Sequence, residues 1–314
     1  MISNSDGSKP TVPVLTGPTG SGKSEILLKL LRENPDLEVI SADSRQIYRG
    51  LDIGTDKPTP EQREKYRFHL IDIVSPGERY TAFDFTRDAR QWLEKIQSEG
   101  RKALVCGGTG LYIRSLVEGI AEIPEGDYHY REQLQEEVVT RGPQYLYEQL
   151  KTIDPAEAEK IHPHNIRRII RALEIFKITG QPKSSFLSES RTDSNNDVNF
   201  MVICLMPDRE RLYKAINDRV DKMMKAGLLR EVEELYNRGI KDTILAINVI
   251  GYNELIDYLD DRISLDSAIT QIKQNTRRFA KRQITWFKGM KDIRYVRNDK
   301  EVIDILRVHW KGEK

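Results

Sequence analysis

The chain has 314 residues, of which 38% are hydrophobic and 32% are charged, and its formal net charge is +1. This length favours one large domain or two unequal ones, with ample apolar residues for a core. Its two cysteines, Cys106 and Cys204, form no CxxC pair, which excludes a disulfide framework and a cysteine zinc site. No apolar run approaches about 18 residues, and the first ten residues lack the apolar core of a signal peptide. We therefore expect a cytoplasmic protein.

Short apolar runs alternate with amphipathic stretches over the first 120 residues. The runs at residues 12–16, 38–41, 69–74 and 103–106 predict strands that are buried on both faces, and residues 25–32 predict a helix. Strand–helix alternation of this kind is typical of an α/β fold, with a parallel sheet wrapped by helices.

The pattern changes at residues 123–126, and only helical periodicity follows up to about residue 190. A strand pattern returns at residues 200–206, and helical regions follow at residues 208–239 and 269–290. We therefore predict one catalytic core, residues 1–122 and 198–314, interrupted by an all-helical insertion domain at residues 123–197.

The segment after the first predicted strand matches G-x-x-x-x-G-K-[ST] at every position and leads into a helix. It reads Gly17-Pro18-Thr19-Gly20-Ser21-Gly22-Lys23-Ser24. Such glycines let successive backbone N–H groups face an anion, whereas an ordinary glycine turn would not need the complete motif. We expect Lys23 to place its charge on phosphates and Ser24 to complete the ligand shell of a Mg²⁺ ion. The motif predicts a P-loop NTPase-like fold, and it suits a nucleoside triphosphate or a prenyl pyrophosphate.

Asp43 follows the second predicted strand. The carboxyl ends of neighbouring strands in an open α/β sheet face one crevice, so Asp43 should face the space above the phosphate loop. On its own, an Asp at this place could be a metal outer-shell ligand, a loop cap or a catalytic base.

Seven blocks of the sequence, in order and spacing, resemble the tRNA dimethylallyltransferase family of bacteria over roughly residues 12–297. They read GPTGSGKS, DSRQIYRGLDIGTDKP, HLIDIVSP, CGGTGLYI, DPAEAEKIHP, RRIIRALEIFKITGQP and TRRFAKRQITWFKG. The resemblance implies transfer of a dimethylallyl group from dimethylallyl pyrophosphate to N6 of the adenosine just 3′ of the anticodon in tRNA. It also implies that Asp43 is the general base and that Thr109 lines the reaction channel. Arg219 and the phosphate loop (Gly17, Thr19, Gly20, Ser21, Gly22, Lys23 and Ser24) would bind the pyrophosphate. From its neighbours alone, Arg219 could instead form a salt bridge on the helix surface with Asp218 or Asp221.

Two basic stretches suggest contact with a polyanion, although either could be only a solvated helix face. Residues 271–297 contain nine basic residues and one acid, a local net charge of +8. Earlier, apolar residues at helical spacing leave Arg167 and Arg171 on the opposite side, with Arg168 beside them. The resemblance implies tRNA contacts at the following residues: Asp43, Ser44, Arg45, Gln46, Thr109, Arg131, Arg167, Arg168, Arg171, Lys281, Arg282 and Gln283. Because Ile272, Phe279 and Trp286 recur every seven residues, we expect them in the core rather than as stacking platforms.

Three other functions fit parts of this sequence. A prenyl transferase acting on free adenine nucleotides would lack the helical insertion and the basic C-terminal block. A P-loop kinase or NTPase would turn over ATP and ignore prenyl pyrophosphate. A non-catalytic RNA-binding protein would have no need of both the loop and Asp43. The sequence favours a tRNA-modifying transferase that works with Mg²⁺, and a monomer, because one chain supplies every expected RNA contact.

Overall fold

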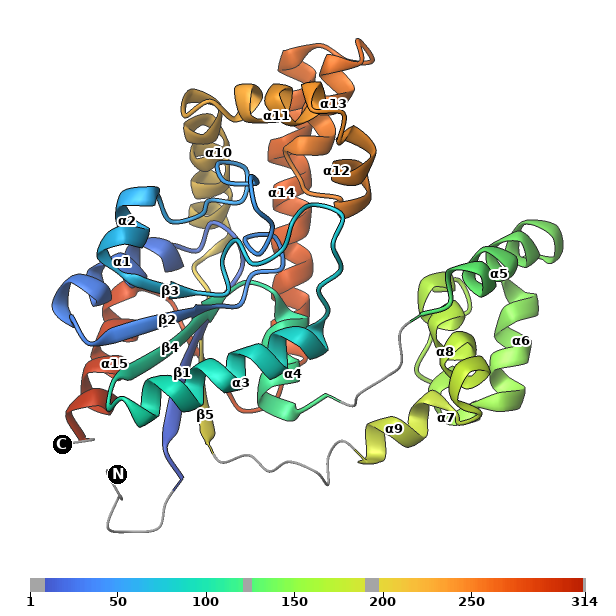
Figure 1. Ribbon diagram of the computed structural model, residues 1–314, viewed down its shortest axis with the longest axis horizontal. Coiled ribbons are helices and arrows are strands. Elements are labelled where there is room, and N and C mark those ends of the chain that lie inside the picture. Colours follow the sequence, from blue (N-terminus) through green and yellow to red (C-terminus); the bar gives the residue numbers. More distant parts are fainter. Residues whose placement is uncertain (1–8, 121–125, 190–197, 313–314) are drawn as a thin grey trace. The chain divides into compact units, whose positions relative to one another are not determined.

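The computed structural model describes residues 9–120, 126–189 and 198–312, which belong to two compact units (Figure 1). The first unit contains residues 1–117 and 196–314 and holds the whole sheet, and the second contains residues 118–195. No helix within the described ranges combines the length and the apolar character needed to cross a membrane.

The first unit is built on a sheet of six parallel strands in the order β3-β2-β4-β1-β5-β6. The strands are β1 (Thr11–Thr16), β2 (Leu37–Ser41), β3 (Arg67–His69), β4 (Lys102–Gly107), β5 (Asn199–Leu205) and β6 (Ile293–Val296). The predicted parallel sheet is confirmed, and the register pairs Leu15 of β1 with Cys106 of β4.

The third predicted strand is wrong in its extent. The apolar run predicts a strand at residues 69–74, whereas β3 ends at His69. Leu70 and Asp72 have left-handed φ angles of 60° and 55°, which a strand does not accommodate. The backbone N–H groups of Asp72 and Ile73 donate to the carbonyls of Gln46 and Ile47. This segment is therefore fastened to the loop after β2, outside the sheet ladder.

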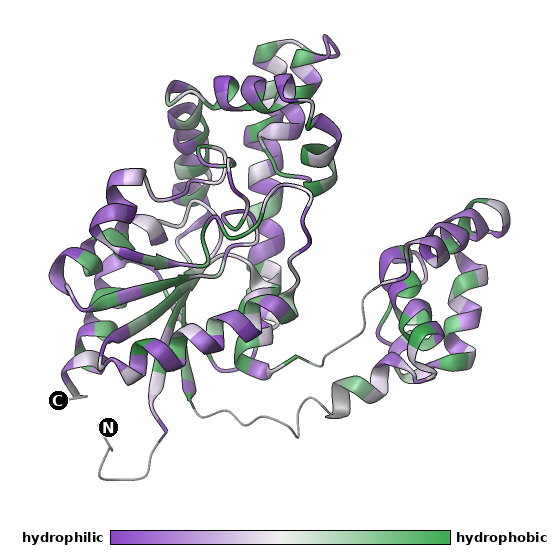
Figure 2. Ribbon diagram, in the orientation of Figure 1, coloured by the Kyte–Doolittle hydropathy of each residue, from purple (hydrophilic) through white to green (hydrophobic). Residues whose placement is uncertain are grey.

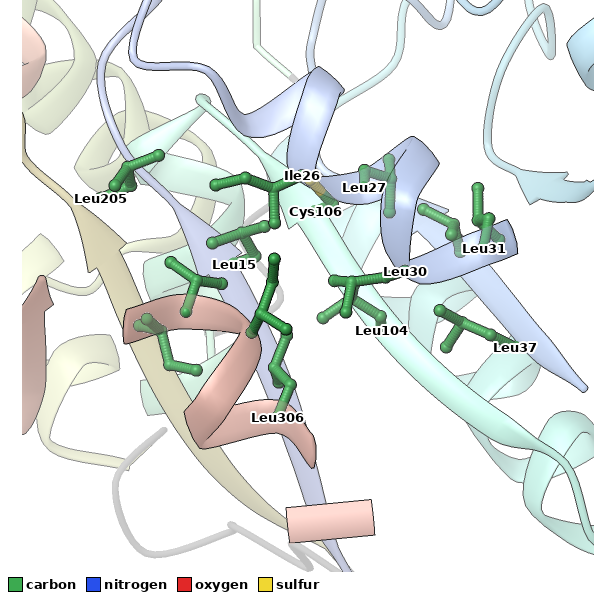
Figure 3. Packing of buried hydrophobic residues seen from close by; sticks show 14 of the residues in the cluster. Leu15, Ile26, Leu27, Leu30, Leu31, Leu37, Leu104, Cys106, Leu205 and Leu306 are labelled. Atoms are coloured by element: carbon green, nitrogen blue, oxygen red, sulfur yellow. The ribbon is translucent and has the colours of Figure 1, made fainter. Parts of the chain in front are cut away.

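Helices cover the sheet on both faces, as a parallel sheet requires. The helices of this unit are α1 (Lys23–Glu33), α2 (Pro60–Lys65), α3 (Ala82–Ser98), α4 (Gly110–Glu118), α10 (Arg209–Lys225), α11 (Leu228–Asn237), α12 (Lys241–Ile247), α13 (Tyr252–Leu259), α14 (Leu265–Lys288) and α15 (Asp299–Gly312). On one face, leucines of α1 and α15 such as Leu30 and Leu306 pack against Leu15 and Leu104 of the central strands (Figure 3). Figure 2 shows the hydrophobic residues gathered in the central strands and hydrophilic residues along the outer sides of the helices.

The segment after β5 forms a second apolar cluster, separate from the one beneath the sheet. Residues of α10, α11, α13 and α14 form it, including Val220, Val232, Leu255 and Ile272. These helices follow β5 in the chain, and α14 contacts both α10 and α13. A long helix is thereby supported along one side, which fixes the side chains that it directs towards the phosphate loop.

The second unit consists of helices in its described residues and has its own core. The helices are α5 (Tyr128–Arg141), α6 (Pro143–Ile153), α7 (Pro155–Ala158), α8 (Ile166–Thr179) and α9 (Lys183–Glu189). Its core joins Leu134, Leu146, Leu150, Ile169 and Leu173, all nearly fully buried. On α8 the apolar face is as the spacing predicts, because Ile169, Ile170 and Leu173 are buried while Arg167 and Arg168 are exposed.

Candidate active site

The loop between β1 and α1 has the backbone geometry of an anion-binding loop. Gly17 and Gly20 have φ angles of +149° and +78°, which residues with a Cβ rarely adopt. A Cβ on Gly17 would lie 2.4 Å from the carbonyl oxygen of Leu205, and one on Gly20 would lie 2.7 Å from Cγ1 of Ile216. The two glycines therefore let the loop close against β5 and α10.

Lys23, the first residue of α1, turns back over this loop. Its Nζ donates to the carbonyls of Gly17 (2.8 Å) and Pro18 (2.9 Å) and to Oγ of Ser21 (3.2 Å). Burial lowers the pKa of Lys23 below its ordinary value of 10.5, and the positive charge of Arg219 reinforces the effect. The ammonium group is thus positioned by the loop in which it would meet a phosphate.

Asp43 lies in the loop after β2, beside the phosphate loop, with Thr109 next to it. The Oδ1 atom of Asp43 accepts from the N–H of Arg45 at 2.9 Å, and Oδ2 accepts no hydrogen bond from the described residues. Oγ1 of Thr109 accepts from the N–H of Ser44 at 2.9 Å and donates to its Oγ at 3.2 Å. The N–H of Thr109 donates to the carbonyl of Ala42 at 3.1 Å. The loops after β2 and β4 therefore hold each other on both sides of Asp43.

Arg219 of α10 forms an ion pair that the sequence did not indicate. Its Nη1 lies 3.1 Å from Oδ2 of Asp56, whereas the sequence suggested an acid of its own helix as the alternative partner. The Nε2 of Gln46 donates to the carbonyls of Thr55 and Asp56 at 3.2 and 3.0 Å. Its Oε1 accepts from Oγ of Ser41 at 3.0 Å. Gln46 thus ties the loop that carries Asp56 to the end of β2.

Glu231 of α11 anchors the same loop from outside the sheet. Its carboxylate accepts from the N–H groups of Asp52 (3.1 Å), Ile53 (2.8 Å) and Gly54 (3.3 Å). The hydroxyl of the fully buried Tyr252 donates to Glu231 at 2.5 Å. Burial first, and then the charge of Glu231, raise the pKa of Tyr252. A Cβ on Gly54 would lie 2.3 Å from the Tyr252 ring, so the loop requires a glycine at this point.

Asp72 has a structural role in the described residues. The Nζ atom of the buried Lys57 lies 2.5 Å from Oδ1 of Asp72 and 2.8 Å from Oδ1 of Asp52, and it donates to the carbonyl of Tyr48 at 2.5 Å. The other oxygen of Asp72 pairs with Arg63. Both oxygens of Asp72 are therefore used within the protein.

Gln283 of α14 joins the two loops that frame the site. It is only 7% exposed. Its Oε1 accepts from the N–H of Thr19 at 2.8 Å, and its Nε2 donates to the carbonyl of Gly108 at 2.8 Å. One turn further on, Trp286 lies so close to Gly110 that a Cβ there would be 2.3 Å from the indole. The glycines of this loop therefore let α14 approach the backbone directly.

The expectation that aromatic residues of α14 lie in the core is wrong for Phe279. Ile272 and Phe287 are 2% and 0% exposed, whereas Phe279 is 38% exposed. Trp286 is half-buried, and its indole N–H has no hydrogen-bond partner within the described ranges. Both Phe279 and Trp286 line the pocket of the candidate site instead of packing into the core.

These elements enclose one pocket of about 920 Å³. Its walls include Lys23, Ser24, Asp43, Thr109 and Arg219, with Phe279 and Trp286 on α14. Ser44, Arg45, Gln46, Arg282 and Gln283 also line it. The structure therefore brings part of the predicted phosphate loop, Thr19, Lys23 and Ser24, into one cavity with the predicted base, at the carboxyl ends of β1, β2 and β4. Gly17, Gly20, Ser21 and Gly22 are not among the residues that line it.

The basic residues of α14 have different environments. Lys281 and Arg282 are exposed, and the Arg282 guanidinium lies 5.7 Å from the centroid of the Phe279 ring. Arg277 is directed inward, where Nη1 donates to Oδ1 of Asn217 at 2.6 Å. The exposed pair provides positive charge next to the pocket.

The four basic residues predicted in the helical unit have two different environments. Arg131 forms two hydrogen bonds with Glu174, of 2.6 and 2.9 Å, and Arg171 pairs with the same carboxylate. Arg167 and Arg168 are exposed and make no ion pair with the described residues. The latter two therefore have free charge for an anionic partner.

Sequence reasoning missed Glu231, Tyr252 and Asp56. Their partners are far away in the chain, with separations of 177 residues for Glu231 with Gly54 and 163 for Asp56 with Arg219. The only local sign of the first contact is the glycine in the Asp52-Ile53-Gly54-Thr55 segment, which indicates a close approach of some other group.

Known proteins match this chain in sequence and in fold over most of its length. The family model described as IPP transferase matches residues 46–290. A tRNA dimethylallyltransferase of Bacillus cereus (strain AH187) is 43% identical over 299 residues, covering 94% of this chain and 93% of its own. The solved tRNA isopentenylpyrophosphate transferase of Bacillus halodurans is 38% identical, with a TM-score of 0.67 and 98% of both chains covered. A eukaryotic dimethylallyltransferase, solved in crystallographic snapshots of its action on tRNA, is 29% identical with a TM-score of 0.76. The match covers 92% of this chain and 74% of that one.

Proposed function

The chain belongs to the IPP transferase family, and it is a transferase. We propose that it moves a dimethylallyl group from dimethylallyl pyrophosphate to N6 of the adenosine on the 3′ side of the anticodon in tRNA. The observation that carries the proposal is the shared pocket of Asp43 and the phosphate loop. Its volume of about 920 Å³ is in the range that accommodates two reacting groups of this size.

The phosphate loop provides the charge that a pyrophosphate leaving group needs. When the C–O bond to the allylic carbon breaks, negative charge grows on the pyrophosphate oxygens. Backbone N–H groups of the loop and the cations of Lys23 and Arg219 would stabilise that charge. Since an anion next to Lys23 favours its protonated form, binding of the donor would raise the lowered pKa of this residue.

Asp43 would accept the proton that the adenine amine releases. This amine is a weak nucleophile because its lone pair is delocalised into the ring, so removal of its proton helps as the C–N bond forms. Oδ2 of Asp43 accepts no hydrogen bond from the described residues, while Oδ1 is held by the Arg45 N–H. Thr109, which holds the neighbouring Ser44, would orient the carboxylate and line the path of the allyl group.

The structure offers a limited ligand set for Mg²⁺. Ser24 lines the pocket at the start of α1, and its hydroxyl makes no hydrogen bond within the described ranges. Among the described residues, no group of three or more acidic, histidine or cysteine side chains could hold a metal ion. These features fit Mg²⁺, which is commonly held by few protein groups together with phosphate oxygens and water. Ser24 would hold the ion, which supplies charge neutralisation for the pyrophosphate.

The tRNA would contact two exposed basic surfaces. Lys281 and Arg282 lie beside the pocket, and Arg167 and Arg168 lie on α8 of the helical unit. The exposed ring of Phe279 in the pocket is suited to stacking with an unstacked base, because sequence-specific RNA recognition commonly uses aromatic platforms.

The deciding experiment is transfer with an unmodified tRNA, Mg²⁺ and dimethylallyl pyrophosphate, followed by mass analysis of the nucleosides. We expect one prenylated adenosine per tRNA and no requirement for ATP. Asp43→Asn should lower the rate by about 10²–10⁴-fold with tRNA binding unchanged. Asp304→Asn, the same change at an exposed residue of α15, provides the matched control. Turnover that needs ATP hydrolysis, or more than about a tenth of the normal rate in Asp43→Asn, would contradict the proposal.

A further inference from the structure

Gln283 differs from its basic neighbours on α14, for which the sequence resemblance implies the same contact with tRNA. Lys281 and Arg282 are exposed, whereas Gln283 is 7% exposed. Two residues along a helix correspond to a rotation of about 200°, so Lys281 and Gln283 point to nearly opposite sides. The amide of Gln283 is therefore used inside the protein.

On the phosphate-loop side, Gln283 fixes a single peptide group from one end. The peptide between Pro18 and Thr19 donates its N–H to Oε1 of Gln283 at 2.8 Å. The carbonyl of the same peptide accepts from Nζ of Lys23 at 2.9 Å and from the N–H of Ser21 at 3.2 Å. The orientation of this peptide thus determines where Lys23 is held.

On the other side, Gln283 fixes a second peptide in the same way. The peptide between Gly108 and Thr109 accepts from Nε2 of Gln283 at 2.8 Å, and its N–H donates to the carbonyl of Ala42 at 3.1 Å. Thr109 in turn holds Ser44, next to Asp43. A Cβ on Gly108 would lie 2.8 Å from Nε2 of Gln283, so the glycine permits this contact.

We propose that Gln283 is a positioning residue of the donor site, which sets the distance between the phosphate loop and the loop that carries Thr109. This role rests on the proposed function, in which the phosphate loop holds the prenyl pyrophosphate. The single amide uses its acceptor for one loop and its donor for the other, so a residue with only one of these groups cannot replace it. Burial makes both bonds costly to lose, because an unsatisfied peptide group remains behind.

The outer and inner residues of α14 would therefore have different roles. The outer residues Lys281 and Arg282 would act on tRNA affinity, and the inner residue Gln283 would act on the use of the prenyl donor. Both functions belong to one rigid helix, so RNA bound to its outer side lies on the element that orders the donor loop.

Two variants of Gln283 test this role, with Lys281→Ala as the matched control on the outer side. Gln283→Met keeps the length of the side chain and removes both hydrogen bonds. Gln283→Glu keeps the acceptor for Thr19 and places an oxygen against the carbonyl of Gly108. For each protein, kcat/KM for dimethylallyl pyrophosphate is measured at saturating tRNA, tRNA affinity is measured at several salt concentrations, and thermal unfolding is followed.

We expect Gln283→Met and Gln283→Glu to lower kcat/KM for the donor at least tenfold, with the Kd for tRNA within twofold of normal and an unchanged salt slope. Lys281→Ala should instead weaken tRNA binding and lower the salt slope. If Gln283→Met does not remain folded, Gln283→Glu decides. Normal use of the donor, or tRNA binding weakened tenfold with donor kinetics intact, overturns the role of Gln283. Absence of any prenylated product with the wild-type protein overturns instead the proposed function on which it rests.

Discussion

Replacement of Arg131 tests whether this residue acts on RNA or on the fold of the helical unit. Its guanidinium makes two hydrogen bonds with Glu174, whose side chain is 0% exposed. Burial alone would raise the pKa of Glu174, but the hydrogen bonds from Arg131 and Arg171 hold it below its ordinary value. A Cβ on Gly126 would lie 2.2 Å from Arg131, so the chain packs closely over this pair.

Arg131→Ala should destabilise the helical unit by about 2 kcal/mol. Removal of one partner of a buried ion pair costs roughly 3–5 kcal/mol when the remaining charge is uncompensated. Here Arg171 remains as a second partner, and Arg131 is itself 29% exposed, so the cost should be smaller. For a unit of this size, about 1 kcal/mol corresponds to roughly 4–8 °C in Tm, so we expect a decrease on the order of 10 °C.

The distribution of tryptophans allows the two units to be followed separately. The three tryptophans, Trp92, Trp286 and Trp310, all belong to the first unit. Circular dichroism reports both units, whereas tryptophan fluorescence reports only the first. Arg131→Ala should therefore lower the Tm of one transition followed by circular dichroism. The Tm of the transition followed by tryptophan fluorescence should not change. Arg168→Ala, an exposed residue without an ion pair among the described residues, is the matched control.

The acid side of the pH dependence gives a second check on the same pair. A carboxyl whose folded-state pKa is lowered adds stability above its unfolded pKa, and that stability is lost as the pH falls through the folded value. The helical unit should therefore lose stability below about pH 4, near the ordinary pKa of Glu, and Glu174→Gln should weaken this pH dependence.

An unchanged circular dichroism transition in Arg131→Ala, or an equal shift in Arg168→Ala, would refute the structural role of Arg131.

Two further predictions concern RNA binding and the donor. Arg167→Ala with Arg168→Ala should weaken tRNA binding about tenfold and lower the slope of log K against log salt by roughly one to two units, measured by titration, with thermal unfolding unchanged. An unchanged slope would show that these arginines are only a solvated face. Because the pKa of Lys23 is lowered, kcat/KM for the donor should decrease with rising pH, and this decrease should begin before pH 10.5, as the ammonium loses its proton. Lys23→Arg should move the decrease to higher pH. An identical pH profile in that variant would contradict the assignment of the decrease to Lys23.

The sequence was sufficient for those parts of the site that depend on local pattern. The phosphate loop is contiguous, and its glycines and Lys23 lie between a strand and a helix, which identifies them without any distant partner. The position of Asp43 follows from the geometry of parallel strands, because neighbouring strands end at the same edge. Both predictions needed only the order of elements along the chain.

The contacts that fasten the site together were outside the reach of such reasoning. Glu231 binds backbone N–H groups, for which the sequence of the loop contains no sign other than Gly54. The strand prediction at residues 69–74 is wrong for a related reason, because the backbone N–H groups of Asp72 and Ile73 donate to the loop after β2. An apolar run predicts burial, but the partner of its hydrogen bonds decides whether it becomes a strand.

On α14, the difference between the predicted and the observed core residues points to a functional residue. A strict seven-residue spacing selects Phe279 and Trp286 as core residues, yet the buried stripe runs through Ile272, Ala280, Gln283 and Phe287. Ala280, Gln283 and Phe287 follow steps of three and four residues, as expected of a helix with 3.6 residues per turn. A glutamine on it has to satisfy its amide inside the protein, because an unpaired buried amide is costly. A polar residue on the inward stripe of an otherwise amphipathic helix therefore indicates a specific buried partner, and here the partners are the two loops of the site.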